Sequence, residues 1–174
     1  MHKIPNISKL PNKPAVYALY GGKGSHKFIA YIGIADKLRQ RVSQHLIRRD
    51  SSITTGASIV SLNPDLVTEM KWWEHELFSK REYLEAAETI AFDILDPILR
   101  SRGKITGRST ELLLEEDQFR REMVSFFLNK QSGHLIFQDF QDLAKVVEKL
   151  ENEIIALNKR IVNIELTIKE FKKN

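Results

Sequence analysis

The sequence predicts an α+β fold, in which a small three-stranded mixed sheet is flanked by helices and followed by a long C-terminal coiled-coil helix. Two observations carry this prediction. Apolar runs typical of a β-hairpin change, after Gly33, to apolar residues spaced four apart, which is the pattern of a helix. Towards the C-terminus, apolar residues recur alternately four and three positions apart over about five heptads, as in a coiled coil.

The first elements are predicted to be the two strands of the hairpin. Residues 16–20 and residues 28–34 are apolar and aromatic, as strands prefer. Residues 21–25 between them form a glycine-rich turn sequence, longer than the tightest hairpin loops.

A helix is predicted to follow the hairpin directly. Its apolar stripe recurs every four residues, at Ile34, Leu38, Val42 and Leu46. Asp36 is expected to be its N-cap. Lys37, Arg41 and His45 form a second row with the same spacing, which we expect at the edge between core and solvent.

The middle of the chain predicts a third strand and two more helices. Residues 50–66 are polar and turn-rich and are expected to form a loop. Residues 67–78 have the aromatic content of a strand, which would lie beside the hairpin. Residues 80–99 and 110–128 are predicted to be helices.

The C-terminal heptads predict a parallel two-stranded coil, and therefore a homodimer. The seam runs from Ile136 to Phe171, with β-branched residues such as Ile154 at the first core position and mostly leucine at the second. Additional apolar residues, such as Ile155, widen the stripe. The alternative of a helix folded back onto its own domain therefore stays open.

Length and composition suit one ordinary domain with an appendage. We expect a domain over residues 1–108 that ends in a basic linker, a helical extension over 109–133 and the coiled-coil helix over 134–174. The 174 residues are 42% hydrophobic, which excludes global disorder, and include no cysteine, which excludes disulfides, thiolate zinc sites and cysteine nucleophiles. Neither a membrane-spanning run nor a signal-peptide core is recognisable, so a cytoplasmic location is expected.

Two tripeptides and two helical residues together resemble the signature of the GIY-YIG nuclease superfamily. Ala15-Val16-Tyr17 keeps the tyrosine of the first motif, and Tyr31-Ile32-Gly33 matches the second without change. Arg41 follows Gly33 by eight residues and His45 follows Arg41 by four, as is usual in that family. The resemblance covers roughly residues 10–100 and implies the family's fold for this part of the chain.

The same resemblance implies a metal-binding glutamate on a later helix. Glu88 precedes Pro97 by nine residues, which is the family's spacing, and Glu85 is the fallback. Some family members have an asparagine shortly after the proline, where this chain has Arg100. An arginine there could take over a phosphate contact.

The implied activity is that of a divalent-metal-dependent DNA endonuclease, which hydrolyses phosphodiester bonds. The resemblance makes Tyr17, Tyr31, Arg41, His45 and Glu88 catalytic, with Glu88 holding Mg²⁺ (or Mn²⁺). Tyr17 is the preferred general base and requires nearby positive charge, because a phenol ordinarily has a pKa of about 10. The choice among Tyr17, Tyr31 and His45 as base stays open.

Clustered basic residues indicate contacts with the DNA backbone, and the net charge of the chain is +4. They lie in the hairpin loop, on the first helix and in a glycine-containing segment after Pro97 that carries no acidic residue. The candidates are Lys27, Arg39, Arg48, Arg49, Arg100, Arg102, Lys104 and Arg108.

Two alternatives remain at this stage. One is a nucleic-acid-binding protein of the same fold that does not cleave. The other is a coiled-coil adaptor whose globular domain only packs, and which would have no affinity for DNA at low salt.

Overall fold

The computed structural model divides the chain into two compact units, His2–Phe137 and Gln138–Asn174, called here the N-terminal and the C-terminal unit. The residues that the structure describes are 6–22, 24–55, 61–99, 106–129, 132–137 and 150–161.

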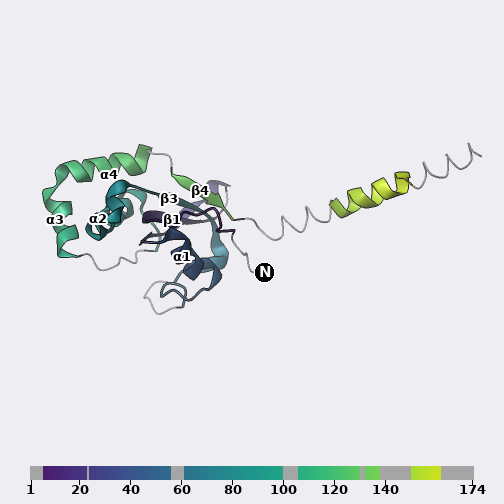
Figure 1. The fold of residues 1–174 in the computed structure, drawn as a ribbon, viewed down its shortest axis with the longest axis horizontal. Helices are drawn as coiled ribbons and strands as arrows, with labels where there is room; N and C mark the ends of the chain where they lie inside the picture. The colour runs from purple at the N-terminus through teal and green to yellow at the C-terminus, as the bar shows by residue number, and fades with distance from the viewer. Residues whose placement is uncertain are drawn as a thin grey trace, which may run out of the picture. The chain divides into compact units, whose positions relative to one another are not determined.

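The N-terminal unit has the predicted α+β class, built around one antiparallel sheet of four strands (Figure 1). The strands are β1 (Ala15–Gly21), β2 (Phe28–Ala35), β3 (Val67–Trp73) and β4 (Gly133–Ile136), in the order β2-β1-β3-β4. The predicted hairpin and third strand are therefore present. The prediction of a mixed sheet with three strands is wrong, because every pairing is antiparallel and a fourth strand closes one side.

Strand β4 comes from the segment that was predicted to begin the coiled-coil helix. It pairs with β3, so that Gly133 lies opposite Trp72 and Ile136 opposite Glu69. A Cβ at Gly133 would overlap the indole of Trp72, so the close approach of the two strands requires a glycine. A strand of four residues has no periodicity to detect and is stabilised by its partner strand, which explains why the pattern of the sequence does not show it.

Helices cover both faces of the sheet. On one face, α2 (Arg81–Leu95), α3 (Gly107–Glu115) and α4 (Asp117–Asn129) pack on a core that includes Val16 and Trp73. On the other face, α1 (Leu38–Val42) packs on a core that includes Tyr17 and Met70. In Figure 1, α2, α3 and α4 gather together, away from α1.

The helix that follows the hairpin departs from the expected regular geometry. Leu38, Val42 and Leu46 are buried, as the stripe predicts. The predicted N-cap is wrong, because the N-cap is Lys37, which makes no side-chain capping bond, and the Asp36 carboxylate accepts a hydrogen bond from Arg81 instead. After α1 the helix widens into a π-helical turn over Ser43–Ile47.

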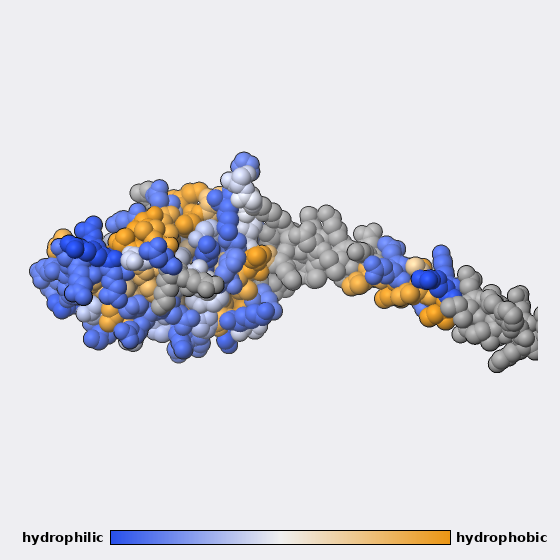
Figure 2. Space-filling view, turned by 90° about the horizontal axis from the view of Figure 1, so that it is seen from above, coloured by the Kyte–Doolittle hydropathy of each residue, from blue (hydrophilic) through white to orange (hydrophobic). Residues whose placement is uncertain are grey.

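In the C-terminal unit the structure describes one helix, over residues 150–161. Its apolar side chains lie along one side and are about half exposed (Figure 2): they belong to Leu150, Ile154, Ile155, Leu157 and Ile161. The predicted long helix over 134–174 is not matched, since residues 133–136 form β4 and the longest helix among the described residues is α2, with 15 residues. The remaining heptads, over 138–149 and 162–174, lie outside the described residues. None of the helices described is long and apolar enough to cross a membrane.

Candidate functional site

The two motif tyrosines meet above a glycine on the sheet. Tyr17 of β1 lies opposite Gly33 of β2, two residues after Tyr31. The rings of Tyr17 and Tyr31 are 6.1 Å apart, and a Cβ on Gly33 would come within 2.8 Å of the Tyr17 hydroxyl and 2.9 Å of the Tyr31 hydroxyl. A side chain at position 33 would therefore push both hydroxyls away, which explains physically why this position requires glycine.

His45 lies directly against Tyr17. Its Nε2 is 2.7 Å from the Tyr17 hydroxyl, and its ring is fully buried. The expected place at the edge between core and solvent is wrong for His45, because the π-helical turn adds a residue to the helix at this point. In that turn the Arg48 amide donates to the Ser43 carbonyl at 2.8 Å. Such turns occur often at functional sites.

The second ring nitrogen of His45 contacts residues that the sequence analysis missed. Its Nδ1 is 2.7 Å from Ser51 Oγ, which in turn lies 2.8 Å from Thr54 Oγ1. Thr54 also donates to the Ser51 carbonyl at 2.9 Å. Both residues belong to the predicted loop. Nothing in the local sequence distinguishes them from the other serines and threonines of that loop, and only the folded chain brings them close to His45.

Arg41 and Glu88 act electrostatically on the same pair of tyrosines. The charge of Arg41 lowers the pKa of each phenol, whereas the charge of Glu88 raises both. Glu88 comes from α2, which packs along the edge strand β2. The structure therefore brings together the five residues selected from the sequence, which lie on two strands and two helical segments.

Burial keeps the two tyrosines as neutral phenols. Burial raises the pKa of Tyr17 well above its usual value, and the neighbouring Tyr31 raises it further. Burial also raises the pKa of Tyr31, and the charge of Glu88 raises it further. Arg41 opposes these effects without overcoming them. The nearby positive charge that a Tyr17 base requires is therefore present but insufficient to ionise it, and Tyr17 acts as a phenol that exchanges its proton.

The His45 ring is neutral over the physiological range. Burial, followed by the charge of Arg41, lowers the pKa of His45 from 6.5 to about 3. A neutral imidazole carries one ring proton and one acceptor nitrogen. One of its two hydrogen bonds is therefore a donation and the other an acceptance.

This lowered pKa predicts a loss of stability in mild acid. Between pH 3 and 6.5 the unfolded chain binds more protons at this histidine than the folded chain does, so stability falls as the pH decreases. From pH 7 to pH 5 we expect the free energy of unfolding to fall by about 2 kcal/mol on account of His45. Urea unfolding at both pH values measures this change. The free energy of unfolding should fall more between pH 7 and pH 5 in the wild type than in His45→Gln. An equal fall in the free energy of unfolding of His45→Gln would contradict the prediction. His26→Gln, at an exposed position, is the control.

Glu85, the fallback metal ligand, is occupied by donors of its own chain. The side chain is buried and accepts hydrogen bonds from Arg81 Nε at 2.8 Å, Ser109 Oγ at 2.9 Å and the Thr106 amide at 3.2 Å. Burial alone would raise the pKa of Glu85, but these hydrogen bonds lower it. Glu85 therefore anchors the start of α3, and Glu88 is the glutamate near the tyrosines.

The site offers one carboxylate for a cation. Within the described ranges, no group of three or more histidine, aspartate or glutamate side chains could enclose a metal ion. A single carboxylate fits Mg²⁺ or Mn²⁺ at a phosphate site, where water and phosphate oxygens complete the shell. The donor set does not suit a structural zinc site, which requires four protein ligands.

A hollow of about 490 Å³ opens beside Arg41. Its polar wall includes Lys37, Gln40, Gln44 and Arg81, and Gln44 accepts a hydrogen bond from Arg41 at 3.3 Å. Lys37, Gln40 and Gln44 are spaced three and four residues apart, a helical pattern that could have identified them in the sequence. The two glutamines carry no charge, so the distribution of basic residues does not reveal them.

The described basic candidates all have partners within the chain. Lys27 pairs with Glu69, Arg48 with Asp50, Arg49 with Asp65 and Arg108 with Glu111, and Arg39 donates to the Leu10 carbonyl. The Arg48–Asp50 and Arg108–Glu111 pairs are exposed, and such pairs contribute at most about 1 kcal/mol, so phosphate can displace them. Arg100, Arg102 and Lys104 lie outside the described residues.

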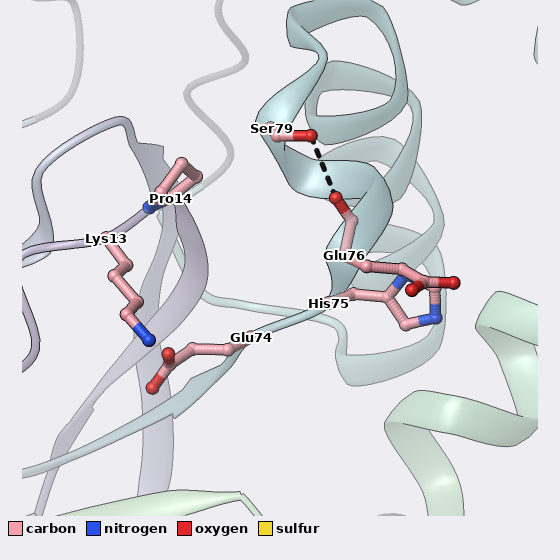
Figure 3. Close-up of a pocket in the computed structure, with 6 residues that line it drawn as sticks. All are labelled: Lys13, Pro14, Glu74, His75, Glu76 and Ser79. Carbon is pink, nitrogen blue, oxygen red and sulfur yellow. Dashed lines mark hydrogen bonds between the residues drawn. The ribbon is translucent and has the colours of Figure 1, made fainter.

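A second hollow, of about 540 Å³, lies between the start of β1 and the connection from β3 to α2 (Figure 3). Lys13 points towards Glu74 across it. His75 faces it but accepts a hydrogen bond from the Leu77 amide and pairs with Glu122 of α4. These roles are structural, so this hollow is not the candidate site.

Comparison with protein-family models, with curated proteins and with solved structures finds no match for this chain. The case for a function therefore rests on the geometry of the site and on the resemblance of its motifs.

Proposed function

We propose that the N-terminal unit is a divalent-metal-dependent DNA endonuclease that hydrolyses phosphodiester bonds. One observation supports this above all others: His45 hydrogen-bonds to Tyr17, and the charges of Arg41 and Glu88 both act on Tyr17 and Tyr31. These are the residues that the resemblance to GIY-YIG nucleases selects. Two buried phenols and a buried imidazole, with a half-buried guanidinium and a half-buried carboxylate acting on them, go beyond what packing requires.

Glu88 is the proposed ligand of Mg²⁺ or Mn²⁺. A cation bound there would withdraw charge from the scissile phosphate and stabilise the departing 3′ oxygen. Arg41 provides a second positive charge next to the phenols and stabilises the charge that develops on the phosphate in the transition state. Tyr31 positions the phosphate through its hydroxyl.

Tyr17 takes part in proton transfer as a neutral phenol. The attacking water forms its bond to phosphorus while its proton passes to the Tyr17 oxygen, and the Tyr17 proton passes to His45 Nε2. The bond from phosphorus to the 3′ oxygen breaks, and that oxygen takes a proton from solvent. The imidazolium formed at His45 then returns its proton through Tyr17, because burial strongly disfavours its charge.

Cleavage of supercoiled plasmid DNA tests the proposed function. Nicked or linear product that appears with Mg²⁺ and disappears with a chelator is the expected result. A protein that binds DNA at low salt but nicks nothing with Mg²⁺ or Mn²⁺ would support the binding protein without cleavage. Absence of DNA binding at low salt would support the coiled-coil adaptor.

The C-terminal heptads extend the proposal to a homodimer. The described helix exposes Leu150, Ile154, Leu157 and Ile161, which are the successive core positions of the heptad pattern. A parallel coil would tether two nuclease units and raise the local concentration of the second site for the second strand of a duplex.

We therefore expect Leu157→Glu to convert the full-length protein from a dimer to a monomer. A charge at a core position must be desolvated in the coil and is left unpaired there. Light scattering at micromolar concentration measures the change, and Lys159→Glu, on the outer side of the heptad, is the matched control. A monomeric wild type would contradict the tether.

A further inference from the structure

We propose that Ser51 and Thr54 are positioning residues that hold His45 in its Nδ1-protonated tautomer, so that the Tyr17 hydroxyl proton points away from the substrate. The assignment of the tautomer follows from the hydrogen bonds and from the burial of the His45 ring. Its consequence for catalysis rests on the proposed nuclease function.

The hydroxyl of Thr54 has two hydrogen-bonding neighbours. Its Oγ1 lies 2.9 Å from the Ser51 carbonyl oxygen and 2.8 Å from Ser51 Oγ. A carbonyl oxygen carries no hydrogen, so Thr54 must be the donor in the first bond. A hydroxyl has one proton, so Thr54 can only accept in the second.

The direction of the remaining bonds follows from this assignment. Ser51 donates its single proton to Thr54, so Ser51 Oγ can only accept from His45 Nδ1, which lies 2.7 Å away. His45 Nδ1 therefore carries the ring proton. Because the buried ring is neutral, its Nε2 has no proton and accepts from the Tyr17 hydroxyl at 2.7 Å.

The opposite tautomer would break this chain of bonds. If Nε2 carried the proton, Nδ1 would need a donor, and Ser51 would have to withdraw its proton from Thr54. Ser51 and His45 are both buried, so a group left without a partner there is not compensated by water. The network therefore favours a single direction of hydrogen bonding from Tyr17 to the Ser51 carbonyl.

This direction decides what Tyr17 offers to a substrate. With its proton on the His45 side, the Tyr17 oxygen has only lone pairs available elsewhere. It can then accept a hydrogen bond from an attacking water and subsequently its proton. In the other tautomer His45 would donate to Tyr17, and the Tyr17 proton would point away from His45, where it would compete with that water.

Nitrogen-15 NMR of the full-length protein, labelled at its histidines, tests the tautomer directly. The wild type should show a protonated Nδ1 and an unprotonated Nε2 at His45 near neutral pH, with the signal assigned by its loss in His45→Gln. A protonated Nε2 in the wild type would overturn the proposal, whether or not the protein cleaves DNA.

Two substitutions test which hydroxyl donates and which accepts in this network. Ser51→Ala removes the acceptor of the Nδ1 proton, and Thr54→Val removes the acceptor of the Ser51 proton, which frees Ser51 to donate to Nδ1. Both should shift the population towards the Nε2-protonated tautomer. The exposed neighbour Ser52→Ala should leave it unchanged. An unshifted tautomer in folded Thr54→Val would overturn the assignment, even if Ser51→Ala failed to fold.

Cleavage kinetics test the consequence for catalysis. In Ser51→Ala and Thr54→Val we expect kcat to fall by about tenfold with KM changed by less than about twofold, since proton transfer and not binding is affected. A shifted tautomer with unchanged kcat would overturn the positioning role. Absence of cleavage by the wild type with the expected tautomer would refute the nuclease function and leave the tautomer assignment intact.

Discussion

Glu88→Gln should abolish cleavage, with a loss in kcat of more than about a thousandfold, while DNA binding stays within about twofold of the wild type. The amide keeps the shape of the side chain but loses the charge that holds a divalent cation. Glu88 raises the pKa of both tyrosines through its charge, which places it within electrostatic range of the proposed reacting groups. Nicking of plasmid DNA over a range of Mg²⁺ concentrations measures the effect.

Glu85→Gln is the matched control for this substitution, one helical turn earlier on α2. Because Glu85 receives hydrogen bonds from Arg81, Ser109 and Thr106, its replacement should lower the free energy of unfolding by about 1–3 kcal/mol. The folded fraction should still cut DNA at close to the normal rate. Full activity in Glu88→Gln combined with none in folded Glu85→Gln would move the metal site to Glu85.

Arg41→Ala should lower kcat by about a hundredfold and weaken DNA binding much less. The charge of Arg41 acts on the two phenols, and Arg41 lines the polar hollow beside α1, where a phosphate can approach it. Its charge would be needed most when negative charge accumulates in the transition state. Single-turnover cleavage and a binding assay without metal ion separate the two effects.

Arg39→Ala provides the comparison for Arg41 on the same helix. Arg39 donates to the Leu10 carbonyl at 2.8 Å, which ties the N-terminal segment to α1. Its removal should affect stability slightly and kcat hardly at all. A variant of Arg41 that binds DNA ten times more weakly but cuts normally at saturation would make Arg41 a docking residue.

The pattern of the sequence alone predicted the α+β class, the hairpin, the third strand and the helix that carries Glu88. These elements are periodic, and their apolar residues recur at the spacing of the face that they bury. The five candidate catalytic residues were also selected from their order and spacing. Their convergence could not be derived, because spacing along the chain does not state which elements pack together.

The hydrogen-bonding partners within the site were decided by the tertiary structure. Ser51 and Thr54 lie in a loop with no periodic signal, and they became relevant only because the loop folds against His45. The burial of His45 depends on a π-helical turn, which a spacing of four residues does not predict. The raised pKa of Tyr17 likewise depends first on its burial by the surrounding protein, which outweighs the opposing charge of Arg41.

The sequence by itself therefore determined the hairpin, the third strand, the helix that carries Glu88 and the identity of the chemical groups. Only the tertiary structure decided the fourth strand, the antiparallel direction of every pairing and the partners of the described basic residues. The physical reason is the range of the interactions. The residues that one helix or strand buries recur at a fixed spacing, which is visible in the local sequence. Strand pairing, desolvation and hydrogen-bond direction depend on groups that are distant in the chain.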